Sequence, residues 1–245
     1  MIKKITFTNN NMMKDITLPD KRIIQVQGSD ANVFISLIER IVATDFSDFY
    51  DNYDAQFGIE GTNFKQVTAH FSFGDFIYKN DVINERYNTS RALHCVRYVG
   101  GKNIRSTFSN TDEKPSTLGV SLTEFTSAIN KASWLRLEML INYVIGDTFF
   151  KVDYNNAKIT FDFEKTADFS KDLAKIMYLI VSECFVSISS GQRFVCLSKI
   201  EGIIDEQMER LLYSLVRISN IDTVFFVNDI SADAKKRLNA GSITI

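Results

Sequence analysis

Short apolar runs, each followed by a polar turn and a helical segment, recur along this chain. The runs at 194–197 and 223–227 are continuously apolar, which is typical of strands buried on both faces of a parallel sheet. A further strand is expected at 21–27. Segments of helical periodicity follow the three strands and end near Ile41, Ile218 and Leu238. This repeated order of strand, turn and helix predicts an α/β fold with a mainly parallel core sheet.

Other segments alternate between apolar and polar positions around a Gly or Asn turn, which predicts antiparallel hairpins. They are residues 64–80, 92–108 and 149–163. An apolar stripe from Trp134 to Val144 predicts a helix that ends at Gly146.

These patterns predict one domain that spans 1–245 and has three parts. The expected parts are a core α/β lobe from 1–60 and 165–245, an antiparallel β subdomain at 61–128, and a helical and hairpin insert at 129–164.

Composition narrows the classes of function. With 45% hydrophobic and 24% charged residues, the chain has the composition of an ordinary globular protein, and a net charge of -2 excludes a globally basic nucleic-acid binder. The 3 cysteines show no CxxC spacing, and the 2 histidines leave little material for a His-based metal site or a Ser–His triad. We find no apolar run of transmembrane length and no export signal. We therefore expect a cytoplasmic protein with no membrane association, no metal and no cofactor.

The segment from Ile23 to Ile41 has the order strand, glycine, loop and amphipathic helix, which is the arrangement of a Walker A phosphate loop. A working loop needs several glycines, a Lys for the terminal phosphates and a Ser or Thr for magnesium. In that register Gly28 is kept, Asp30 lies in the loop, and Phe34 and Ile35 replace the Lys and the Ser or Thr. Phe34 carries no charge, and we expect its ring to occupy the phosphate space. The alternative is a plain β-loop-α unit that never bound phosphate.

The run from Arg193 to Asp205 resembles the Walker B strand and D-loop of ABC-type ATPases. Residues 194–197 match the apolar positions of that pattern, and Ile204-Asp205 match its Leu-Asp. The magnesium-binding Asp and the catalytic Glu are replaced by Ser198 and Lys199.

Further segments resemble the same family in order along the chain. Residues 2–18 resemble the opening of SMC- and RecF-type heads, and 96–110 resemble a hairpin of SMC and RecN heads. Ser170 matches the signature serine, with charged residues in place of the following glycines, and Asn228 stands where the family has its switch histidine.

The resemblance implies a degenerate ABC-type ATPase head of the SMC/RecF/RecN class. Phosphoryl transfer depends on magnesium, Lys and an oriented nucleophile, and the residues that supply them are replaced here. We therefore expect a catalytically inactive binding or scaffolding module in a DNA-associated process such as repair, phage or mobile-element biology, or CRISPR adaptation. Its implied partners are a second copy or a related ATPase. Two alternatives stay open: an active ATPase that uses Lys199, and a purely structural interaction protein.

One expectation tests this resemblance directly. An ancestral nucleotide pocket requires Phe34 and Ser198 to face each other across the tips of adjacent strands.

Positive charge is densest around the hairpin at 92–108, where tyrosines lie between the basic residues. This pattern favours contact with nucleic acid, and DNA is the candidate partner. The alternative is an exposed face kept soluble by its charge. The basic residues are Arg86, Arg91, Arg97, Lys102 and Arg105.

Overall fold

The computed structural model describes most of the chain, and every structural statement below refers to the described residues. These are 1–9, 12–42, 64–79, 82–85, 93–98, 120–121, 131–153, 158–162, 173, 176–177, 192–198, 200–218 and 221–245.

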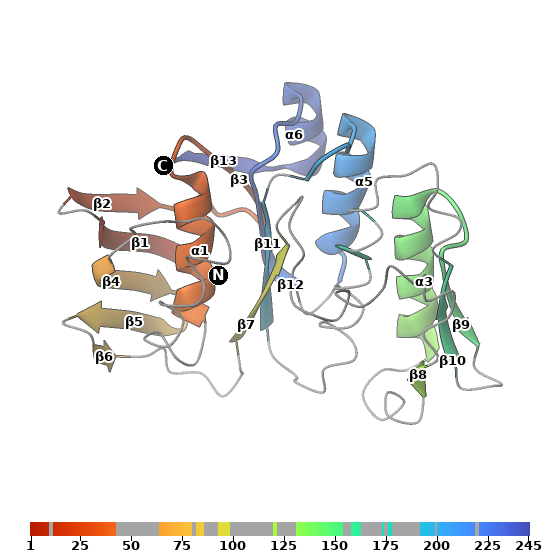
Figure 1. The fold of residues 1–245 in the computed structure, drawn as a ribbon, viewed down its shortest axis with the longest axis horizontal. Coiled ribbons are helices and arrows are strands. Elements are labelled where there is room, and N and C mark those ends of the chain that lie inside the picture. Colours follow the sequence, from red (N-terminus) through yellow and green to blue (C-terminus); the bar gives the residue numbers. More distant parts are fainter. Residues whose placement is uncertain are drawn as a thin grey trace.

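A five-stranded parallel sheet forms the centre of the described chain (Figure 1). Its strand order is β13-β3-β12-β11-β7, and each neighbouring pair is parallel. The bounds are β3 (Ile23–Gln27), β7 (Leu93–Tyr98), β11 (Gln192–Leu197), β12 (Ile221–Phe226) and β13 (Gly241–Thr244). The interior strand β11, between β12 and β7, is apolar throughout 194–197 because its alternate side chains enter the hydrophobic cores on the two opposite faces.

An antiparallel sheet lies on one side of the parallel sheet, in the order β2-β1-β4-β5-β6 (Figure 1). Its strands are β1 (Ile2–Asn9), β2 (Met12–Thr17), β4 (Phe64–Phe71), β5 (Gly74–Lys79) and β6 (Val82–Glu85). One core joins this sheet to the parallel sheet, because Phe7 and Phe76 belong to the same buried cluster as Phe194 and Phe225.

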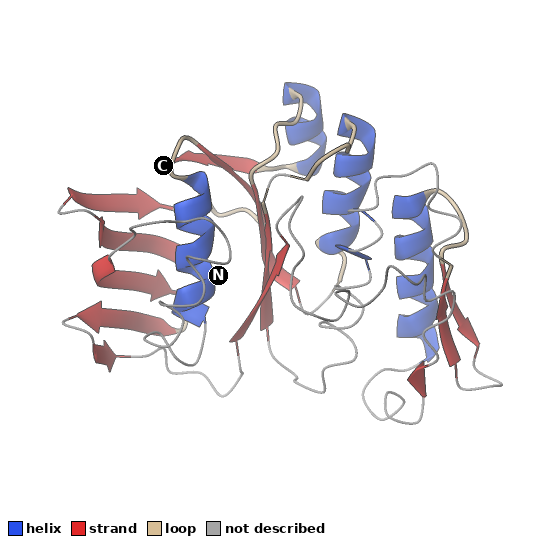
Figure 2. Cartoon of the chain, in the orientation of Figure 1, coloured by secondary structure: helices blue, strands red, loops and turns tan. Residues whose placement is uncertain are grey.

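Helix α1 (Ala31–Val42) fills the space between these two sheets (Figure 2). Most of its side chains are buried, while Asn32 is exposed and Val33 and Glu39 are half-buried. Its buried residues are Ala31, Phe34, Ile35, Ser36, Leu37, Ile38, Arg40, Ile41 and Val42.

The opposite face of the parallel sheet is covered by helices α5 (Asp205–Leu215) and α6 (Ala232–Leu238). Helix α3 (Lys131–Ile145) packs against α5 from further out. A small antiparallel sheet with the order β8-β10-β9 completes this side, from β8 (Val120–Ser121), β9 (Phe150–Asp153) and β10 (Lys158–Phe161).

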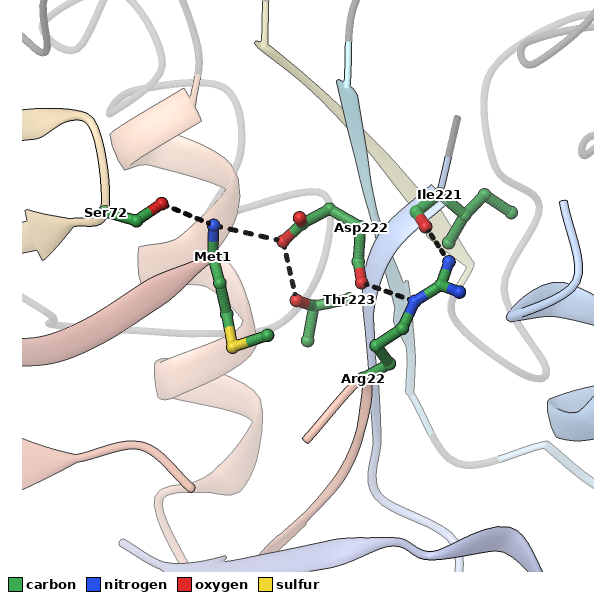
Figure 3. A network of polar contacts seen from close by, with 6 residues as sticks. All are labelled: Met1, Arg22, Ser72, Ile221, Asp222 and Thr223. Atoms are coloured by element: carbon green, nitrogen blue, oxygen red, sulfur yellow. Dashed lines mark hydrogen bonds and ion pairs between the residues drawn. The ribbon is translucent and has the colours of Figure 1, made fainter. Parts of the chain in front are cut away.

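Polar contacts tie the two large sheets together at the amino end of β12 (Figure 3). The Met1 amino group lies 3.3 Å from Ser72 Oγ and 3.6 Å from Asp222 Oδ2. Thr223 Oγ1 donates to the same carboxylate oxygen of Asp222 at 2.8 Å, and Arg22 Nε donates to the Asp222 carbonyl at 3.3 Å. This edge of the parallel sheet is therefore occupied by structural contacts, and the carboxyl edge is the place to look for a site.

Several sequence-based predictions are confirmed. The parallel sheet is present, and hairpins form at β4–β5 and β9–β10. The predicted helices are α3, α5 and α6, and α6 has the predicted bounds of 232–238. Among the described residues, no helix combines the length and apolar character needed to cross a membrane.

The predicted division into subdomains differs from the observed strand pairing. β1 and β2 were expected in the core lobe, yet β1 pairs with β4 of the antiparallel sheet. β7 was expected in the antiparallel subdomain, yet it pairs in parallel with β11. Two-residue periodicity identifies a strand, but the partner along its edge depends on distant parts of the chain.

We predict a pH-dependent contribution from the ion pair that joins α5 to α6. Arg237 Nε and Nη2 each lie 2.7 Å from a Glu209 carboxylate oxygen, and this bidentate contact lowers the pKa of Glu209. Because the pKa of Glu209 is lowered in the folded state, the ion pair stabilises the fold at pH values above the ordinary glutamate pKa of about 4.3. This stabilisation disappears as the pH falls through the folded-state pKa.

Replacing Arg237 by Gln should raise the pKa of Glu209 in a carboxyl NMR titration. It should also lower the free energy of unfolding at neutral pH, but only slightly, because the Arg237 guanidinium is exposed and solvent screens the pair. Lys236→Gln removes a neighbouring exposed charge and serves as the control. An unchanged Glu209 titration in Arg237→Gln would contradict the assignment.

Candidate functional site at the carboxyl edge of the parallel sheet

The chain leaves β3 and β12 toward opposite faces of the parallel sheet. β3 leads into α1 on the face shared with the antiparallel sheet, whereas β12 leads into α6 on the other face. The two strands are neighbours in the sheet. In open α/β sheets, ligands bind outside the carboxyl ends of strands at such a reversal. The residues that follow these ends are Gly28 to Asp30 and Val227 to Asp229.

Side-chain hydrogen bonds join the carboxyl ends of three strands at this edge. Gln25 Nε2 donates to the Asn228 carbonyl at 2.9 Å and to Asp229 Oδ1 at 3.4 Å. The Asn228 side chain accepts from the Ile200 amide at 2.7 Å and donates to the Ile200 carbonyl at 2.9 Å. Asn228 therefore fixes the segment that follows β11, and both ends of its amide are engaged in that task.

The loop between β3 and α1 is short and closely covered. Gly28 has a φ of +103°, and a Cβ atom there would lie 2.3 Å from the Ile245 carbonyl oxygen. The Ile245 amide donates to the Gln27 carbonyl at 2.9 Å, which holds this covering backbone in place. Gly28 is thus required by the close approach of Ile245, a reason that does not involve phosphate.

A carboxylate of the protein itself, that of Asp30, lies at the start of α1. Asp30 directly precedes the helix, and its carbonyl accepts from the Phe34 amide at 3.0 Å. Its carboxylate pairs with Lys14 Nζ on β2 at 2.6 Å. Helix amino ends favour negative charge, which makes them frequent phosphate sites. Here the negative charge is supplied by the Asp30 side chain, and the cation beside it, Lys14, is already paired with it.

Phe34 lies in the core, and the expectation that its ring occupies the phosphate space is wrong. The residue is fully buried and meets Phe225 of β12 edge to face, with ring centroids 6.1 Å apart. Because the helix begins at Ala31, Phe34 falls one turn further on and belongs to the face that packs on the sheet. Ile35 is fully buried in the same cluster.

The expected adjacency of the two strand tips is also wrong, because β12 lies between β3 and β11. Ser198 directly follows β11, and its amide donates to the Tyr98 carbonyl at 2.8 Å. Its buried Oγ has no hydrogen-bond partner among the described residues, and neither has Gln25 Oε1. Motifs matched along the sequence carry no information on the order of strands in the sheet, so they could not reveal that β12 lies between β3 and β11.

The remaining predicted site residues are placed only in part. Asp205 is exposed in the first turn of α5. The main chain of Arg97 lies in β7. Ser170, Lys199, Arg86, Arg91, Lys102 and Arg105 lie outside the described residues, so the nucleic-acid prediction for this basic cluster stays a prediction.

Sequence reasoning missed the residues that organise this edge. In the sequence, Gln25 is the residue that could best have pointed to this edge, because a polar residue in a buried strand requires hydrogen-bond partners. Ile245 and Lys14 act through contacts that no local motif encodes.

The described residues hold no group of three or more His, Cys, Asp or Glu side chains arranged to bind a metal ion. Comparison with protein-family models and with curated protein sequences gave no match to this chain.

We predict that Gly28→Ala destabilises the fold more than Gly202→Ala. Both glycines have positive φ, at +103° and +66°, but a Cβ at Gly202 meets nothing within 4 Å. Backbone strain of this kind costs about 1–3 kcal/mol, and at Gly28 the clash with Ile245 adds to it. Urea unfolding of the two variants measures the difference, and equal losses would show that Ile245 does not constrain Gly28.

Proposed function

We propose that this protein is a catalytically inactive ATPase head of the ABC type, in the SMC/RecF/RecN class. In this proposal it serves as a binding or scaffolding module in a DNA-associated process and pairs with a second copy or with a related ATPase. The class, the pairing and the link to DNA come from the resemblance of the sequence motifs. Because Phe34 and Ser198 do not face each other across adjacent strand tips, the proposal does not rest on a pocket between these two residues. It rests on the strand order and the loops around the reversal between β3 and β12.

The observation that carries the proposal is the arrangement of the carboxyl edge of the parallel sheet. The glycine loop after β3 and the polar residues after β12 and β11 meet at the reversal of strand direction, the usual ligand position in such sheets. The same edge is filled by the protein's own groups, namely Ile245 over Gly28 and Asp30 beside α1. The loops therefore meet where nucleotide-binding sheets hold their ligand, while the protein's own groups close this edge against a nucleotide. A pseudoenzyme would combine these two features.

The chemistry of the replaced residues supports inactivity. Nucleotide hydrolysis relies on positioned cations that neutralise the phosphates and on a group that orients water. Phe34 offers an apolar ring that is buried against Phe225. Ser198 offers a hydroxyl in place of a carboxylate, and Asn228 is engaged with Ile200. A triphosphate at this loop would also meet the Asp30 carboxylate, and like charges repel.

We predict no magnesium-dependent phosphate release from ATP or GTP by the purified chain. The measurement is a phosphate-release assay on the wild type and on Lys199→Ala, which tests the lysine that an active enzyme would have to use. Turnover in the wild type that is lost in Lys199→Ala would replace the pseudoenzyme by a divergent ATPase.

We also predict that Phe34→Lys does not create a phosphate site. The charged side chain would enter the core beside Phe225, so the loss of packing alone lowers the free energy of unfolding by ~3–5 kcal/mol. Asn32→Lys, on the exposed side of the same turn, is the matched control and should unfold like the wild type. A stable Phe34→Lys protein with new ATP binding would place Phe34 in a phosphate site.

A further inference from the structure

A surface with exposed apolar and cationic side chains runs across α3 and α5, far along the chain from the loop after β3. Figure 1 shows the two helices side by side, and they are in contact. We call this surface the α3–α5 face. Its members are Leu135, Met139 and Tyr143 on α3, Arg210 and Tyr213 on α5, and Arg217 just after the end of α5.

Helix α3 carries two apolar stripes. One contains Trp134, Leu137 and Ile141 and is buried in the core. The other has residues four apart, one helical turn each, and its side chains are exposed. The exposed fractions are 45% for Leu135, 74% for Met139 and 50% for Tyr143. A surface helix ordinarily needs one apolar stripe, and packing within the described part of the chain does not account for the second one.

The α5 part of the surface is organised by stacked aromatic and guanidinium groups. Tyr143 and Tyr213 meet edge to face with ring centroids 6.3 Å apart, which makes the surface continuous between the helices. Arg210 Cζ lies 5.4 Å from the centroid of the Tyr143 ring, and Arg217 Cζ lies 4.0 Å from that of Tyr213. Stacking of this kind limits the freedom of both guanidinium groups and leaves the N–H edge of Arg217 available to an acceptor.

The charge on this surface favours an acidic ligand. Arg210 is paired with Glu206 one turn before it. No ion pair joins Arg217, or the exposed Arg136 on α3, to an acidic side chain in the described part of the chain. A carboxylate that reaches Arg217 would therefore gain an unshared, stacked guanidinium.

A shallow, open depression of about 580 Å³ lies beside Tyr143 at the carboxyl end of α3. Arg210 lines one side, and the turn from Gly146 to Thr148 lines another. Its size suits one or two large side chains of a bound chain.

We propose that the α3–α5 face binds an acidic amphipathic helix of a partner protein. Its apolar side chains, one turn apart, would cover Leu135, Met139 and Tyr143, and its carboxylates would face the two stacked arginines. Leu135 and Tyr143 lie eight positions apart on α3, a rise of about 12 Å, so a partner helix of three turns spans this row.

A protein partner accounts for the surface better than nucleic acid. Leu135 and Met139 are aliphatic and give bases no ring to stack on. Tyr, Met and Arg are the residue types enriched at protein interfaces. The inference does not depend on the proposed function, because none of these residues belongs to the carboxyl edge of the parallel sheet.

The test uses a fluorescent 18-residue helical peptide as the probe, with Leu at every third or fourth position and Glu at most others. A peptide with Lys in place of Glu is its charge-reversed counterpart. We expect the acidic peptide to bind the full chain by fluorescence anisotropy and to bind at least ~10-fold more tightly than the Lys peptide. Met139→Asp and Arg217→Glu should each weaken binding of the acidic peptide by ~10-fold or more.

Met13→Asp is the matched control, because Met13 on β2 is also 74% exposed but lies outside the α3–α5 face. It should bind the peptide like the wild type, and thermal unfolding checks that all variants fold. The proposal is overturned if the acidic peptide does not bind, if the Lys peptide binds as tightly, or if Met13→Asp is as damaging as Met139→Asp. It is also overturned if Met139→Asp disrupts self-association in sedimentation, or weakens binding of a single-stranded oligonucleotide, since the face would then serve another occupant.

Discussion

Helix α1 is held between two sheets, and much of the remaining structure follows from that burial. Its apolar sides contact the antiparallel sheet and the parallel sheet at once, so one core unites strands from both. The contact of Phe34 with Phe225 places the start of the helix over β12. A helix fixed in this way cannot turn its first residues toward a ligand without opening the core, and burial of a phenylalanine contributes several kcal/mol to stability, about 3–5 when it is truncated. The loop that leads into α1 is therefore shaped by packing.

The carboxyl edge of the parallel sheet shows how a site can be kept in outline while its contacts become structural. Gln25 and Asn228 use hydrogen bonds to join three strand ends, with Asn228 directed at the backbone of Ile200. Asp30 is paired with Lys14, and Gly28 is covered by Ile245. Gln25 Nε2, the Asn228 side-chain amide and the Asp30 carboxylate each bond to another part of the same chain, which lowers the cost of burying them. The proposed scaffolding role agrees with an edge whose groups hold the fold together.

The sequence predicted the elements of this fold better than their arrangement. Apolar runs identified β11 and β12 because both of their faces are buried, and the helical stripes identified α3, α5 and α6. The partner of β7 and the placement of β12 between β3 and β11 depend on long-range pairing, which local periodicity does not encode. At the site, motif register correctly singled out Gly28 as a special position but misplaced Phe34, because it assumed a loop longer than the one that precedes Ala31. The covering backbone of Ile245, more than two hundred residues away in sequence, was invisible to that reasoning.

The central claim is that the loop after β3 is closed by protein contacts and does not hold phosphate. An NMR titration of the labelled chain with Mg·ATP, followed at the amides of residues 28–33 and 227–229, tests it most directly. The account predicts that these signals stay in place up to millimolar nucleotide. Saturable shifts at Gly28, Ser29 and Asn228 would contradict it, since they would require Ile245 and Asp30 to yield their positions to a bound nucleotide.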